Sequence, residues 1–100
     1  DTEGAFEVKS KMPDAVLIFI VPKDLETLHA RLVGRGTETA EQVAKRFGKA
    51  KEEIAKAVRY DYLIINDNID TCAEEFINIV KCEKLKVHYE SNKKLIEQLI

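Results

Sequence analysis

Three arginines lie within sixteen positions in the first half of the chain: Arg31, Arg35 and Arg46. Gly34 and Gly36 flank the middle one, so the backbone there is free of the steric restriction that a Cβ imposes. A guanidinium presents a planar fork of donors that suits phosphate oxygens two at a time. Phosphoryl transfer depends mainly on positioning and on neutralising negative charge, so a loop that can bend and carries such forks favours this chemistry. The alternative for each arginine is a solvated or carboxylate-paired side chain at the surface.

Composition limits what the rest of the chain can be. One hundred residues make one domain at most, or part of one. The formal net charge is −2 with 34% charged residues of mixed sign, so the charge balance does not predict nucleic-acid binding. The longest apolar run, residues 15–22, is too short to cross a membrane, and no signal-peptide pattern opens the sequence. We expect a cytoplasmic protein with no nucleic-acid or membrane partner.

The cysteines and histidines form no metal-site pattern. Cys72 and Cys82 lie ten positions apart, with no CxxC motif and no histidine pair nearby. This spacing predicts free thiols in a reducing compartment and no metal held by protein ligands. His29 and His88 fit no motif, and we expect both at the surface.

Two apolar runs predict buried strands. Residues 15–21 are continuous, β-branched and aromatic, and residues 62–65 form a second such run. Continuous apolar strands are typical of parallel sheets that are covered on both faces. Two strands joined by helix, loop and helix make a right-handed βαβ unit, and ligands of such sheets bind beyond the carboxyl ends of the strands. Asn66 and Asp67 follow the second strand at such an end.

Helix signals surround the two strands. The sequence predicts a first helix from near Gly4 that ends before Met12, because proline follows at position 13. Asp24 can cap a second helix, which ends at Gly34. The remaining signals predict a helix capped by Thr39 and Gln42 that runs to about Val58, a helix capped by Asp70 that runs to about Val87, and a helix over residues 91–100.

Arg46 lies on the helix that follows the arginine loop. At about 100° per residue it falls roughly 60° from the centre of an apolar stripe that runs from Val43 to Val58. Its stem can pack at the edge of the core while its charged head lies along the surface. This position suits a ligand contact and equally suits an arginine that only shields the core.

Taken together, these motifs resemble the C-terminal half of a bacterial guanylate kinase. The opening is similar to the family's D-x-Q-G-A element, with Glu3 in place of the common Gln. The resemblance fades after about Lys86, and its matching segments are residues 1–5, 31–39, 45–46, 60–62 and 65–67. It implies an α/β fold, namely part of a P-loop-type parallel sheet with flanking helices and a helical lid at about residues 31–50.

Guanylate kinases transfer the γ-phosphoryl group of ATP to GMP with Mg²⁺. The resemblance therefore implies ATP and GMP as partners and Mg²⁺ as the cofactor that accompanies ATP. By the same resemblance, the site residues are Arg35 and Arg46 as catalytic contacts to the transferring phosphates, Arg31, Arg35, Asn66 and Asp67 around ATP, and Asp1 toward GMP.

The phosphate-binding loop of such enzymes is not in this sequence. No G-x-x-x-x-G-K-[ST] motif occurs among the four glycines, and the family's GMP-binding segment is missing as well. We therefore expect residues 1–100 to be the C-terminal part of a guanylate kinase core that is inactive as a kinase on its own.

Two other interpretations remain open. Guanylate-kinase-like domains of scaffold proteins bind proteins without catalysis, but they tend to lose phosphate-binding residues, and Arg35 and Arg46 are present here. Alternatively, half of a parallel sheet exposes an apolar edge, and such a structural fragment could self-associate as a homo-oligomer through that edge.

Overall fold

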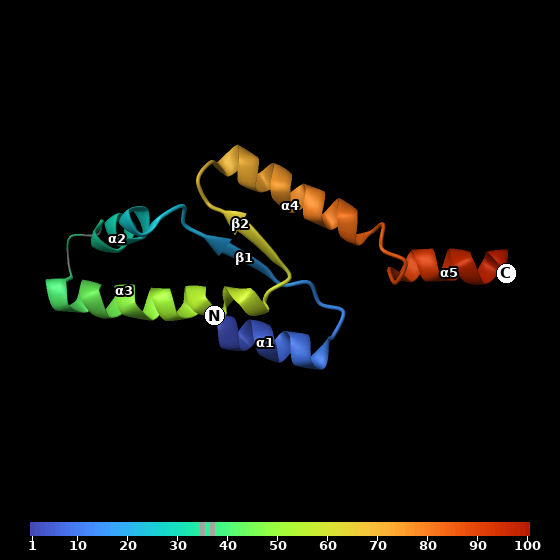
Figure 1. Cartoon of the computed structure of the whole chain (residues 1–100), viewed down its shortest axis with the longest axis horizontal. Coiled ribbons are helices and arrows are strands. Elements are labelled where there is room, and N and C mark those ends of the chain that lie inside the picture. Colours follow the sequence, from blue (N-terminus) through green and yellow to red (C-terminus); the bar gives the residue numbers. More distant parts are fainter. Residues whose placement is uncertain (35, 37) are drawn as a thin grey trace. The chain divides into compact units, whose positions relative to one another are not determined.

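The computed structural model describes residues 1–34, 36 and 38–100 (Figure 1). The predicted site residue Arg35 lies outside the described residues, as does Thr37. The chain divides into two compact units, Asp1–Asp67 and Asn68–Ile100. All the described site residues predicted from the sequence belong to the first unit.

Two short parallel strands form the sheet of the first unit (Figure 1). β1 spans Ile18–Val21 and β2 spans Tyr62–Ile65, and the last residues of the two strands, Val21 and Ile65, are paired. Helices α2 and α3 lie between the strands in the chain. The predicted mixed α/β class, with a small parallel sheet and flanking helices, is confirmed.

β1 begins later than predicted, at Ile18 instead of position 15. The Leu17 N–H donates to Oδ2 of Asp61 at 2.8 Å, and the Leu17 carbonyl accepts from the backbone N–H groups of Asp61 and Tyr62 at 2.9 and 3.1 Å. Lys9 forms an ion pair with the same carboxylate at 3.1 Å. At the amino end of the sheet, the Asp61 carboxylate thus accepts the hydrogen bond that a backbone carbonyl of a neighbouring strand would otherwise accept.

The prediction that both faces of the strands are covered is wrong for this sheet. Ile64 is 1% exposed, but Leu63 and Ile65 point to the opposite face of β2 and are 55% and 50% exposed. Ile20 on β1 is 59% exposed. An apolar run shows that a strand is hydrophobic, but it does not show which elements pack on each face. The sequence therefore predicted more burial than these strands have.

An aromatic cluster joins the first helix to the sheet. α1 spans Thr2–Lys11 and starts earlier than the predicted Gly4, because Asp1 caps it. The ring of Tyr60 meets Phe6 of α1 and Phe19 of β1 edge to face, with centroid distances of 5.7 and 5.0 Å. Such pairs add specific geometry to apolar burial.

The two helices of the crossover have the predicted caps. α2 spans Leu25–Val33, with the Asp24 side chain as its N-cap and Gly34 as its C-cap. α3 spans Ala40–Ala55, and Thr39 and Gln42 form the complete capping box that the sequence predicted.

The apolar stripe of α3 ends before Val58. A short 3₁₀ segment, η1, takes over at Lys56–Arg59 and leaves Val58 89% exposed. Nearer its start, α3 meets α2 through Phe47, whose ring contacts the exposed His29 edge to face at 5.4 Å. This histidine therefore lies at the surface, as predicted, and packs there.

The second unit consists of two helices, α4 (Ile69–Glu83) and α5 (Glu90–Leu99). The prediction that Asp70 caps α4 is wrong, because the Asn68 side chain accepts from the backbone N–H groups of Asp70 and Thr71. The predicted end near Val87 is also wrong. α4 stops at Glu83, and the Asn92 side chain of α5 donates to the carbonyls of Lys84 and Lys86 at 2.7 and 2.8 Å.

Candidate functional site

The carboxyl ends of β1 and β2 lie side by side and carry polar residues. The backbone N–H of Asn66 donates to the Val21 carbonyl at 2.7 Å, which extends the parallel ladder one step beyond the paired Val21 and Ile65. The segment after β1 and the segment after β2 therefore start next to each other. This is the edge at which ligands of open α/β sheets bind.

Arg31 reaches this edge from α2. Its Nη2 donates to the backbone carbonyl of Asn66 at 3.3 Å, across 35 residues of chain. The helix is held at its start by the Asp24 carboxylate, which accepts from the Thr27 backbone N–H at 2.7 Å. The structure thus brings together two residues that the sequence assigned to one ATP site, although strand topology alone did not place Arg31.

Lys23 joins the same cluster and was missed in the sequence. Its Nζ lies 3.5 Å from Oδ1 of Asp67, and both side chains are about half exposed or more. The signal that could have identified it is its position directly after β1, beyond Pro22. An exposed pair of this kind contributes little to stability, so both side chains can be recruited by a charged ligand.

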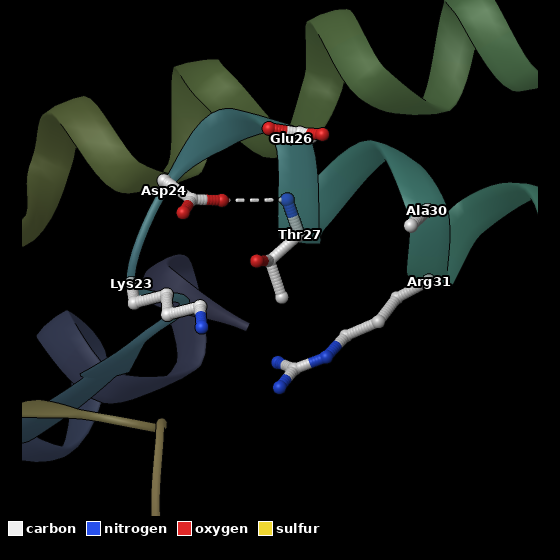
Figure 2. Close-up of a pocket in the computed structure, with 6 residues that line it drawn as sticks. All are labelled: Lys23, Asp24, Glu26, Thr27, Ala30 and Arg31. Carbon is white, nitrogen blue, oxygen red and sulfur yellow. Dashed lines mark hydrogen bonds between the residues drawn. The ribbon is translucent and has the colours of Figure 1, made fainter.

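An open hollow of about 540 Å³ lies beside α2 (Figure 2). Figure 2 shows Lys23 and Arg31 extending into it, with the Thr27 side chain above their charged ends. The residues that line it are Lys23, Asp24, Glu26, Thr27, Ala30 and Arg31. Two cations, two carboxylates and a hydroxyl suit a polar ligand that carries both anionic groups and hydrogen-bond donors.

The N-cap of α2 also affects the charge at this hollow. A hydrogen bond from the Thr27 backbone N–H holds the pKa of Asp24 below its ordinary value, and the Thr27 hydroxyl and the charge of Lys23 lower it further. Asp24 is therefore a carboxylate at neutral pH.

Arg46 forms an ion pair with Glu38 through its Nη1. Its side chain is 44% exposed, which agrees with the predicted place at the border between core and solvent. Among the residues that the structure describes, no hydrogen bond or ion pair joins Arg46 to Arg31, Asn66 or Asp67.

Asp1 acts as a helix cap. Its Oδ1 accepts from the Gly4 backbone N–H at 2.6 Å. A Cβ at position 4 would lie 2.9 Å from that oxygen, so glycine leaves room for the capping carboxylate. The following N–H, that of Thr2, donates to Oε2 of Glu53 at 3.3 Å, which fixes the start of α1 against α3.

Within the described part of the chain, no group of three or more histidine, cysteine, aspartate or glutamate side chains is arranged to hold a metal ion. The described helices also include none that is long and apolar enough to cross a membrane.

Comparison with known proteins identifies the family. The family model of guanylate kinase matches residues 1–83. The chain belongs to the guanylate kinase family. It is 47% identical over 87 residues to the guanylate kinase of Lactococcus lactis, and 47% identical over 95 residues to that of Streptococcus pneumoniae. These matches cover 87% and 90% of the chain, which confirms the resemblance seen in the sequence.

The chain spans less than half of these guanylate kinases. The matched segment makes up 42% of the Lactococcus lactis protein and 46% of the Streptococcus pneumoniae protein. The family match ends at residue 83, near the point at which the sequence motifs fade.

Proposed function

We propose that this chain supplies the ATP side of a guanylate kinase, the enzyme that transfers the γ-phosphoryl group of ATP to GMP to give ADP and GDP. In this proposal residues 1–100 are the C-terminal part of the core, with a lid at about residues 31–50. The observation that carries the proposal is the hydrogen bond from Arg31 to Asn66, because it gathers polar residues at the carboxyl edge of the sheet. Family membership supplies the reaction class.

Each site residue has a task in this proposal. Arg35 and Arg46 neutralise the charge on the transferring phosphates, and Arg31 supports ATP at the edge of the sheet. Asn66 and Asp67 line the adenine side of ATP. A preorganised donor that stabilises developing charge is typically worth about 10²–10³ in rate.

Asp1 is proposed to lie toward GMP. Its carboxylate already caps α1, so we expect it to act there mainly by holding the helix start in place. The described acidic residues do not fit a metal cage. In this proposal Mg²⁺ would be held by the ATP phosphates, where it would neutralise negative charge.

The arginine roles can be tested in a chimeric enzyme. The 87 residues of the Lactococcus lactis guanylate kinase that match this chain would be replaced by their counterparts here. Arg35→Ala and Arg46→Ala should each lower turnover by about 10²–10³ while the melting temperature stays close to that of the parent chimera. A variant with near-normal turnover would remove its arginine from the proposal.

A binding measurement separates this proposal from the protein-binding alternative. Scaffold-type domains should bind phosphopeptides, whereas an enzyme segment should respond to ATP. Calorimetric titration of the chimera with Mg-ATP, GMP and a phosphoserine peptide compares the three directly. The proposal requires nucleotide binding, and selective peptide binding would contradict it.

A further inference from the structure

The ion pair between Glu38 and Arg46 joins α3 to the residue that precedes its N-cap. Glu38 directly precedes Thr39, the N-cap of α3, and Arg46 lies eight residues further along the chain within that helix. The capping box formed by Thr39 and Gln42 fixes the backbone at the helix start. Because Glu38 adjoins the N-cap of the helix that carries Arg46, the two backbones are held at a fixed separation and less conformational entropy is lost when the pair forms.

The pair uses only one side of the guanidinium. Glu38 contacts Nη1 through Oε1, and within the described residues Arg46 makes no other hydrogen bond. An arginine has five N–H donors, so Nε and Nη2 remain able to bind an anion. The Glu38 side chain is only 26% exposed, compared with 44% for Arg46, so the arginine is the more accessible partner of the pair.

The second oxygen of the Glu38 carboxylate, Oε2, is buried and has no hydrogen-bond partner among the described residues. Glu38 also lies at the amino end of α3, where the helix dipole favours a negative charge. Burial of one oxygen and the favourable position at the helix start both limit where the carboxylate can lie, while Oε1 contacts the arginine.

We propose that Glu38 is a positioning residue that holds the Arg46 guanidinium with its free donors facing an incoming phosphate group. This inference rests on the proposed function, since it takes Arg46 as a phosphate contact. Glu38 lies within the matching segment 31–39, but the resemblance assigned it no role in the site.

The expected effect of Glu38→Gln on anion binding is opposite to the effect of charge alone. Removing a negative charge beside an anion site should strengthen anion binding by Coulomb's law. If Glu38 positions Arg46, Glu38→Gln should instead weaken binding, because the guanidinium loses its orientation. Because exposed ion pairs of this type are weak, we expect the Kd for the anion to rise by about two- to fivefold in Glu38→Gln.

The experiment uses the 100-residue chain and inorganic tripolyphosphate as the probe. The ¹⁵N-labelled arginine Nε–Hε signal of Arg46, assigned with Arg46→Lys, reports side-chain order before any ligand is added and then the Kd in a titration. Glu41→Gln is the matched control, since it removes one exposed acidic charge in the first turn of α3 without touching the described Arg46 pair. Glu38→Asp keeps the charge on a shorter side chain.

We expect Arg46 to be ordered in the parent and in Glu41→Gln, and to become mobile in Glu38→Gln with a Kd about two- to fivefold higher. For Glu38→Asp, both the order of the Arg46 side chain and the Kd should lie between those of the parent and those of Glu38→Gln. Unchanged Arg46 order or tighter binding in Glu38→Gln would overturn the positioning role and leave phosphate binding intact. A parent chain whose Arg46 signal does not respond to tripolyphosphate would overturn the phosphate role of Arg46 itself, and with it this inference.

Discussion

Arg31 on α2 donates a hydrogen bond to the backbone carbonyl of Asn66, the residue that follows β2, at 3.3 Å. The two residues are 35 positions apart, so this contact ties the crossover to the carboxyl edge of the sheet. Because the acceptor is a backbone carbonyl, the contact depends on Arg31 and not on the side chain at position 66. It sets the direction in which the guanidinium extends into the hollow beside α2 (Figure 2).

Replacing Arg31 tests whether this edge binds ATP. In the chimeric enzyme, Arg31→Ala should raise the KM for ATP by about tenfold and leave the KM for GMP unchanged, because one charge-assisted contact is lost on the ATP side only. Steady-state kinetics with each substrate varied in turn provides both values.

Arg59→Ala is the matched control for that measurement. Arg59 is the last residue of η1, and its guanidinium stacks on the Phe6 ring at 3.6 Å. Arg59→Ala therefore removes one positive charge, as Arg31→Ala does, but at a position away from the proposed site. An equal rise in the KM for ATP in both variants would mean that net charge, and not the Arg31 contact, is responsible.

The capping box of α3 predicts a stability effect. Thr39→Ala removes the hydroxyl that accepts from the Gln42 N–H at 3.1 Å, and should lower the free energy of unfolding by about 1 kcal/mol. Thr39→Ser retains the acceptor and should stay close to the parent. Urea denaturation followed by circular dichroism measures both, and an Ala variant as stable as the Ser variant would contradict the prediction.

The Asp24 cap predicts a pH dependence. Since the folded-state pKa of Asp24 lies below the unfolded one, its carboxylate stabilises the fold above the unfolded pKa, and this contribution is lost as pH falls through the folded-state pKa. Asp24→Asn keeps a capping side chain but cannot titrate. Thermal melts between about pH 6 and pH 2 should therefore show a steeper acid loss for the parent than for Asp24→Asn. Parallel curves would contradict the lowered pKa.

The exposed face of β2 predicts self-association of the isolated chain. Leu63 and Ile65 are 55% and 50% exposed on one face of the strand, and apolar strands that lack cover tend to pair. Light scattering at increasing concentration should show a rising mean mass for the parent and a smaller rise for Leu63→Lys. A monomer at every concentration would contradict this prediction.

Much of the first unit could be predicted from local signals. The Thr39 and Gln42 capping box, the Asp24 cap and the strand at Tyr62–Ile65 each depend on a few adjacent residues, and each was found as predicted. The misplaced cap of α4 shows the limit of such signals. Asn68 and Asp70 are both good capping residues, and only the backbone turn decides which one reaches the first free N–H groups.

Long-range contacts could not be predicted in the same way. The carboxylate of Asp61 accepts a hydrogen bond from the Leu17 N–H, just before β1, across 44 residues of chain. The pattern of residues 15–21 gives no sign of this contact. The contact of Arg31 with Asn66 is of the same kind. Motif resemblance assigned both of these residues to one site, whereas the side chain that completes the edge, Lys23, belonged to no motif and was found only in the structure.

Formation of GDP from GMP and Mg-ATP by the chimera shows directly whether these residues can serve in a guanylate kinase active site. A coupled assay that follows ADP, with chromatography to identify GDP, measures transfer in the chimera and in its Arg46→Ala variant. We expect GDP formation by the chimera, a loss of about 10²–10³ in turnover in the variant, and no transfer by the 100-residue chain alone. A chimera that melts cooperatively and binds both nucleotides but forms no GDP would contradict the claim that these residues belong to a guanylate kinase active site.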